Sequence, residues 1–168
     1  RIDILVNNSA RSFLRPLMDL REDGYDKIMD TNVKALFLLS RECAKVMKEQ
    51  GGGRIINITT VGAERAGKGL GVYHASKAAV KMLSMCMANE WAQYNINVNC
   101  VGPGLTRTEF SRPIWENPEM SKRVASTIPK GRIAEPEEIV GAVIYLASEA
   151  SSFVTGQSIY VDGGSMAS

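Results

Sequence analysis

Apolar residues recur at steps of three and four along two long stretches of the chain, residues 23–48 and residues 73–94. This spacing gathers the apolar side chains on one side of an α-helix, so each stretch predicts a long amphipathic helix. Residues 136–148 predict a third helix, because Pro136 stands in its first turn and two glutamates follow, where the helix dipole favours them.

Four short runs rich in β-branched residues predict strands between these helices. They lie at residues 2–6, 54–60, 97–101 and 158–161. The segment 102–130 is broken by four prolines, and we expect a functional loop or lid there, because irregular segments of that length are uncommon in compact domains. The alternation of strands and helices predicts an α/β fold, with a parallel sheet covered by helices on both faces.

The composition is that of one globular domain, expected to cover residues 1–168. Hydrophobic residues make up 45% of the 168 positions and charged residues 23%, both close to the usual fractions. A net charge of +2 gives no reason to expect a nucleic-acid partner, and no apolar run reaches the roughly 20 residues of a membrane helix. Cys43, Cys86 and Cys100 match neither a disulfide framework nor a metal site, which favours a cytoplasmic protein without bound metal.

The segment Tyr73-His74-Ala75-Ser76-Lys77 carries the most informative chemistry. Residues four apart lie one helical turn from each other, so Tyr73 and Lys77 share one side of the predicted helix. A phenol has a pKa of about 10, and a neighbouring ammonium group lowers it by roughly 1–3 units. We therefore expect a proton donor and acceptor that works near neutral pH, as the interconversion of alcohols and carbonyls requires.

Polar or glycine residues follow three of the predicted strands. Asn7-Asn8 ends the first, Thr59-Thr60 the second, and Pro103-Gly104 the third. Ligands bind outside the carboxyl ends of strands in open α/β sheets, so these ends are expected to form one site. Thr59 and Thr60 are neighbours on a predicted strand and point to opposite faces, which leaves Thr60 as the candidate.

Taken together, these segments resemble the C-terminal two-thirds of the short-chain dehydrogenase/reductase family. The resemblance extends in order along almost the whole chain and implies a Rossmann-like doubly wound sheet. The matching segments are 7–10 (NNSA), Asn32, 54–61, 73–77 (YHASK), 97–99, 103–108, 131–132, 136–138, 155–156 and 161–164.

The resemblance implies a role for each of four catalytic residues. Tyr73 would be the general acid and base, and Lys77 would lower its pKa and bind the nicotinamide ribose. Asn32 would hold a water molecule that links Lys77 to solvent. Thr60 would polarise the substrate carbonyl.

The same resemblance implies NAD or NADP as the cofactor. Besides Tyr73 and Lys77, it assigns cofactor contacts to Asn7 on the adenosine side. It also assigns contacts with the carboxamide to the loop that contains Pro103, Gly104, Thr106 and Thr108.

Two departures from the family pattern change this interpretation. Thr60 stands where the family usually has serine, and its extra methyl group stiffens the side chain. The family's opening half, with its phosphate-binding loop, has no counterpart here. Arg1 leads directly into the strand 2–6. We therefore expect a chain truncated at its N-terminus, with an exposed apolar edge along that first strand.

The predicted function is the NAD(P)-dependent interconversion of a secondary alcohol and a ketone. Similarity to sugar-acid dehydrogenases and to 3-oxoacyl-carrier-protein reductases leaves two substrate classes open. The alternative is a non-catalytic family member that acts as a binding or scaffold subunit, for which Thr60 is the best support. The apolar surface of the two long helices predicts a homodimer or homotetramer.

Overall fold

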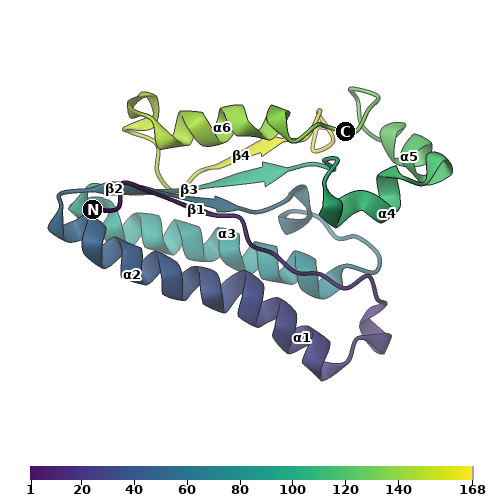
Figure 1. Cartoon of the computed structure of the whole chain (residues 1–168), viewed down its shortest axis with the longest axis horizontal. Helices are drawn as coiled ribbons and strands as arrows, with labels where there is room; N and C mark the ends of the chain where they lie inside the picture. The colour runs from purple at the N-terminus through teal and green to yellow at the C-terminus, as the bar shows by residue number, and fades with distance from the viewer. Residues whose placement is uncertain (168) are drawn as a thin grey trace.

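Four parallel strands form one sheet, in the order β1-β2-β3-β4, in the computed structural model, which describes residues 1–167. The strands are β1 (Ile4–Asn7), β2 (Gly53–Ile58), β3 (Ile96–Pro103) and β4 (Ser158–Val161). Because all four run in the same direction, their carboxyl ends lie along one edge of the sheet. In Figure 1 the arrowheads of β3 and β4 point to this edge, on the side where α4 and α5 lie.

Six α-helices connect and cover the strands within residues 1–167. Their bounds are α1 (Glu22–Met29), α2 (Ala35–Glu49), α3 (Gly71–Trp91), α4 (Arg112–Trp115), α5 (Pro118–Ala125) and α6 (Glu137–Ala147). A π-helical turn, Asp30–Lys34, joins α1 to α2 without a break. The long helix predicted at 23–48 is therefore present, with a local widening around Asn32 that its periodicity does not reveal.

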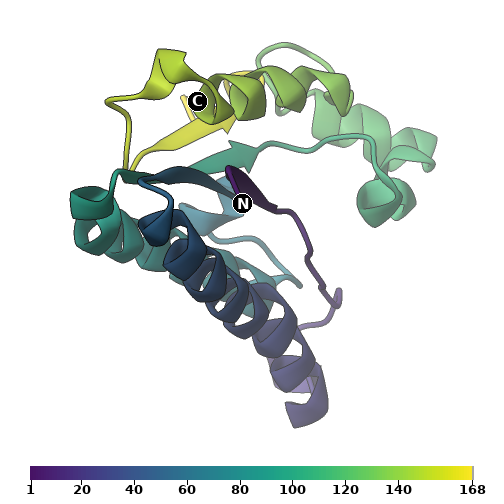
Figure 2. The same cartoon turned by 60° about the vertical axis from the view of Figure 1, so that its left-hand side comes forward.

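Helices cover both faces of the sheet, as predicted (Figures 1 and 2). On one face α2 and α3 pack over a core that contains Leu36, Met47, Ile55, Val80 and Val98. On the other face α6 packs over a smaller core that contains Ile56, Val101 and Leu146. Each crossover moves to the next strand in the same direction. The crossover through α6 therefore has the opposite hand to those through α2 and α3.

β1 is an edge strand with one uncovered face. The residues of β1 alternate between the two faces of the sheet. Asn7 faces α2, whereas Ile4 and Val6 lie on the opposite face, where α6 covers the other strands but not β1. Ile4 is 46% exposed and Val6 is 43% exposed. The predicted apolar edge is confirmed.

Two differences from the predicted elements stand out, one at the end of β2 and one in the segment 102–130. β2 ends at Ile58 and not at Thr60, because the Thr60 hydroxyl caps a short 3-10 turn, Val61–Ala63, by accepting a hydrogen bond from the Gly62 N–H. The proline-rich segment 102–130 is more regular than expected, since it contains the end of β3 together with α4 and α5. Among residues 1–167, no helix is both long and apolar enough to cross a bilayer.

Candidate active site

Tyr73 and Lys77 are buried in the first two turns of α3, beside the carboxyl end of β2. Tyr73 is 9% exposed and Lys77 is 2% exposed. The Lys77 ammonium donates a hydrogen bond to the carbonyl of Ile58, the last residue of β2, at 2.8 Å. This bond attaches the predicted catalytic helix to the edge of the sheet where ligands are expected.

Burial changes the ionisation of both side chains. It raises the pKa of Tyr73 to about 12 and lowers the pKa of Lys77 to about 8. The expected lowering of the Tyr73 pKa by Lys77 is therefore wrong for the chain by itself. The cost of removing the phenolate from water dominates, and burial also weakens the charge that Lys77 can offer.

Asn32 lies in the π-helical turn, fully buried, and connects two parts of the site. Its side-chain oxygen accepts a hydrogen bond from the Arg11 N–H at 2.7 Å, and its amide nitrogen donates to the Arg11 carbonyl at 2.9 Å. The same nitrogen donates to the Ser76 hydroxyl at 2.9 Å, and that hydroxyl donates to the Tyr73 carbonyl at 2.7 Å.

Asn32 thus holds the loop after β1 against the helix turn that carries Tyr73. No observation tests the water molecule predicted for Asn32, and that role stays a prediction. Ser76 was missed from the sequence, although a small polar residue inside the Tyr73–Lys77 turn could have indicated a link of this kind.

Thr60 lies just beyond β2 and beside the end of β3. Its hydroxyl donates to the Pro103 carbonyl at 3.4 Å and accepts from the Gly62 N–H at 3.3 Å. Thr59 is buried, and its hydroxyl donates to the Val101 carbonyl at 3.1 Å inside the sheet. The Thr59 hydroxyl is thus engaged inside the sheet, and the role of Thr60 stays a prediction.

Two aromatic rings flank Tyr73. The ring centroid of Phe110 is 5.5 Å from that of Tyr73, and the centroid of His74 is 5.8 Å away. His74 packs against the loop after β2, where a Cβ atom at Gly62 would lie 2.4 Å from the imidazole. Phe110 is 51% exposed. Phe110 was missed from the sequence, because only the folded path of the loop after β3 brings it to Tyr73.

The loop predicted to hold the carboxamide leaves the sheet at the same edge. The Gly104 N–H donates to the Val161 carbonyl at 2.9 Å, and a Cβ atom at Gly104 would lie 2.8 Å from the Asp162 Cα. Only glycine fits at this distance. The Thr106 hydroxyl donates to the Gly104 carbonyl at 3.2 Å, and the Thr108 hydroxyl lies 3.4 Å from that of Ser111.

The resemblance implies that Asn7 contacts the adenosine side of the cofactor, but in the structure its side chain points inward. Its amide nitrogen donates to the Ser40 hydroxyl at 2.9 Å and to the Asn57 side-chain oxygen at 2.8 Å, between the sheet and α2. The Asn57 amide in turn donates to the Ser84 hydroxyl of α3 at 2.8 Å. The physical reason is the alternation of the strand, which turns Asn7 inward, where two buried polar partners satisfy both of its amide hydrogens.

Comparison with known proteins places this arrangement in a family. The model of a family described as enoyl-(acyl carrier protein) reductase matches residues 1–166. Dehydrogenase/reductase SDR family member 4 of Bos taurus is 42% identical over 166 residues, which are 98% of this chain and 60% of that protein. The chain belongs to the short-chain dehydrogenase/reductase family.

Sugar-acid enzymes are among the other members of this family that the chain resembles. Gluconate 5-dehydrogenase of Gluconobacter oxydans is 39% identical over 163 residues, 97% of this chain and 64% of that enzyme. A crystal structure of a gluconate 5-dehydrogenase from Burkholderia cenocepacia, in complex with NADP and tartrate, superposes with a TM-score of 0.97. It is 38% identical, and the match covers 99% of this chain and 66% of that one. The chain thus spans about three fifths to two thirds of the length of these short-chain dehydrogenases.

Proposed function

We propose that the protein is an NAD(P)-dependent oxidoreductase that interconverts a secondary alcohol and a ketone. The observation that carries this proposal is the burial of Tyr73 and Lys77, one helical turn apart, at the carboxyl edge of the sheet. Thr60 supplies a hydroxyl at the same edge, and Asn32 positions the helix. The non-catalytic alternative gains no support, since all four residues are present and the relatives are named as dehydrogenases or reductases.

The donor set fits the nicotinamide end of a dinucleotide. Lys77 has three N–H donors, and the carbonyl of Ile58 occupies one of them. The other two can bind the hydroxyls of a ribose. The loop from Pro103 to Thr108 would lie along the carboxamide. Relatives solved with NADP support that cofactor, and NAD stays the alternative.

The chain's own residues would handle the proton and the carbonyl oxygen. The cofactor, when bound, supplies or accepts the hydride. In the direction of reduction, Tyr73 donates its proton to the substrate oxygen while Thr60 donates a hydrogen bond to the same atom. With its pKa raised by burial, the Tyr73 phenol is protonated at neutral pH, so the proton to be donated is present. In the direction of oxidation the phenolate is needed, and the positive charge of Lys77 favours it.

A sugar acid is the first substrate class that we propose. Its support is the similarity to gluconate 5-dehydrogenase and to 2-dehydro-3-deoxy-D-gluconate 5-dehydrogenase of Dickeya dadantii, which is 38% identical over 168 residues. A 3-oxoacyl thioester is the second class, supported by the acyl-carrier-protein description of the matching family model.

The test is a turnover assay on the purified natural protein. NADH and NADPH are each offered with 5-ketogluconate and with an acetoacetyl thioester, and oxidation of the cofactor is followed. Tyr73→Phe is expected to reduce kcat by about 10²–10⁴-fold, the usual contribution of a general acid, while cofactor affinity changes little. Retention of most of kcat in Tyr73→Phe would exclude the assigned role.

We also propose that the protein assembles as a homodimer or homotetramer in the cytoplasm. Large apolar side chains remain exposed along α2 and α3, namely Leu38, Leu39, Val46, Met82 and Met85. Pairing with the same helices of a second subunit would bury them. Light scattering of the natural protein at micromolar concentration tests the assembly, and a monomer would contradict it.

A further inference from the structure

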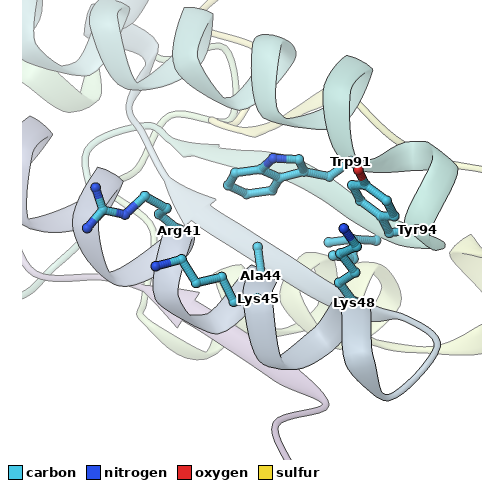
Figure 3. Close-up of a pocket in the computed structure, with 7 residues that line it drawn as sticks. Arg41, Ala44, Lys45, Lys48, Trp91 and Tyr94 are labelled. Atoms are coloured by element: carbon cyan, nitrogen blue, oxygen red, sulfur yellow. The ribbon is translucent and has the colours of Figure 1, made fainter.

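The groove between α2 and α3 belongs to the surface that we propose for the pairing of subunits. Trp91 and Tyr94 line it together with Ala44 of α2 (Figure 3). A second subunit packed on these helices would cover it, so it offers no separate ligand site. The polar side chains on the loop after β2 are a different case, because they bond to other parts of the same chain and lie close to Thr60.

Glu64, Lys81 and Tyr160 meet at one carboxylate oxygen beside the candidate active site. Glu64 directly follows the 3-10 turn that Thr60 caps. Lys81 lies one turn after Lys77 on α3, and Tyr160 lies on β4. The Lys81 ammonium and the Tyr160 hydroxyl both donate hydrogen bonds to Oε1 of Glu64. One carboxylate thus joins the loop after β2 to α3 and to β4.

Tyr160 can reach Glu64 because the strand between them carries a glycine. Gly102 of β3 and Tyr160 of β4 are partners in the sheet, and a Cβ atom at Gly102 would lie 2.4 Å from the Tyr160 ring. A glycine inside a strand often marks such a close approach. The ring therefore lies across β3, on its way from β4 to the loop after β2.

The charges of this cluster support its hydrogen bonds at neutral pH. Lys81 holds the pKa of the Glu64 carboxyl below its usual value, so Glu64 is ionised. Burial, together with the Glu64 carboxylate, raises the pKa of Tyr160, so the phenol keeps the proton that it donates. An ionised acceptor forms stronger hydrogen bonds than a neutral one.

Arg65, the next residue, attaches the loop a second time. Its guanidinium donates to the Ser165 carbonyl at 2.7 Å. Tyr160 and Ser165 are 96 and 100 residues away from their partners along the chain. Two adjacent residues of the loop are thus bound to the C-terminal part of the chain, which holds the loop from the side of β4.

We propose that Glu64 is a positioning residue that orients the Thr60 hydroxyl. The Gly62 N–H of the intervening turn donates to this hydroxyl at 3.3 Å. An oxygen that accepts from this N–H directs its own proton elsewhere, here to the Pro103 carbonyl at 3.4 Å. That bond is long, so the proton can turn to a substrate oxygen at little cost. The inference rests on the proposed function, since Thr60 has to act on the substrate.

A double-mutant cycle on the natural protein tests this role. Glu64→Ala is expected to lower kcat about tenfold, a part of the 10²–10³-fold that one oxyanion donor contributes in another enzyme, and to change the KM for NADPH less than about twofold. In a Thr60→Val background the same change should alter kcat less than about twofold, because no hydroxyl is left to orient. Glu64→Gln keeps an acceptor oxygen and should stay within about threefold of the wild-type kcat.

Hydrogen exchange measures the loop without relying on turnover. The peptide that covers residues 61–70 should exchange at least about tenfold faster in Glu64→Ala than in the wild type. Glu22→Ala, at an exposed position in the first turn of α1, is the matched control and should change neither kcat nor this exchange.

Two results would overturn the proposal. One is an unchanged exchange of residues 61–70 in Glu64→Ala. The other is a loss of kcat that is equally large with and without the Thr60 hydroxyl, since a general loss of structure would produce it. Failure of the proposed function is a separate outcome, because it would appear as a retained kcat in Tyr73→Phe while the coupling between Glu64 and Thr60 stays measurable.

Discussion

Asn7→Ala distinguishes a structural role of this side chain from a cofactor contact. In the structure the Asn7 amide donates two buried hydrogen bonds, to Ser40 and to Asn57, and Asn7 is 8% exposed. Each such bond contributes about 0.5–1.5 kcal/mol net, and a buried acceptor left without a donor costs about 1–3 kcal/mol. Because Asn57 loses the donor to its side-chain oxygen, we expect the free energy of unfolding to fall by about 2–4 kcal/mol.

The assay combines chemical and thermal unfolding with a cofactor titration on the natural protein. The expected loss of stability corresponds to a decrease in Tm of about 4–16 °C for a domain of this size. The Kd for NADP is expected to stay within about twofold of the wild-type value, since that factor corresponds to less than 0.5 kcal/mol. Asn8→Ala is the matched control, because the neighbouring side chain is exposed and its removal should change stability by less than about 0.5 kcal/mol.

The opposite pattern would refute this reasoning. If Asn7→Ala keeps the wild-type stability and weakens NADP binding about tenfold, then Asn7 contacts the cofactor and the buried bonds contribute little. A loss of stability in Asn8→Ala equal to that in Asn7→Ala would show that the turn itself, and not the buried amide, is responsible.

Three further predictions concern the reaction site. The pKa of Lys77 is about 8 in the folded chain and 10.5 ordinarily, so between these values the unfolded chain binds more protons. Lys77 should therefore contribute a rise of about 3 kcal/mol to the free energy of unfolding across this window, and the difference in this free energy between the wild type and Lys77→Met should grow by that amount with pH in denaturant titrations. Lys77→Met should also weaken NADP binding in a titration, and an unchanged Kd would exclude the ribose contact. Thr60→Ser should keep or raise kcat because the hydroxyl stays. Thr60→Val should lower kcat by roughly 10²–10³-fold, which is the effect of removing one oxyanion donor in another enzyme. A wild-type kcat in Thr60→Val would show that the hydroxyl takes no part in the reaction.

Periodicity was enough to predict the long helix at 23–48, the helices α3 and α6, the four strands and the edge of the sheet where the candidate site lies, but not α4 and α5. These features depend on local spacing and on the general rule that parallel strands end together. The orientation of Asn7 could not be predicted in this way, because an asparagine at the end of a strand has the same sequence context whether it faces a ligand or a helix. Its orientation is decided by Ser40 and Asn57, which are 33 and 50 residues away along the chain.

The pKa of Tyr73 was mispredicted for a related reason. Sequence spacing correctly placed Lys77 one turn away, and proximity to a cation alone lowers the pKa of a phenol. Burial acts in the opposite direction, and it depends on how closely the sheet and the loops pack around α3. Phe110 illustrates the same limit, since its contact with Tyr73 exists only because the loop after β3 returns to the helix.

Polar residues inside the core connect the fold to the chemistry. Asn7, Asn57, Cys100 and Ser158 occupy one row across the four strands, and the Asn57 amide donates to Ser84 of α3. Ser84 lies seven residues after Lys77, two helical turns along the same side of α3, and Lys77 itself donates to the carbonyl of Ile58, the residue after Asn57. Apolar contacts tolerate sliding of a helix over a sheet, whereas two directional hydrogen bonds to adjacent residues of one strand do not. The buried amides thus fix the position of α3 along β2, and with it the position of Lys77 at the edge of the sheet.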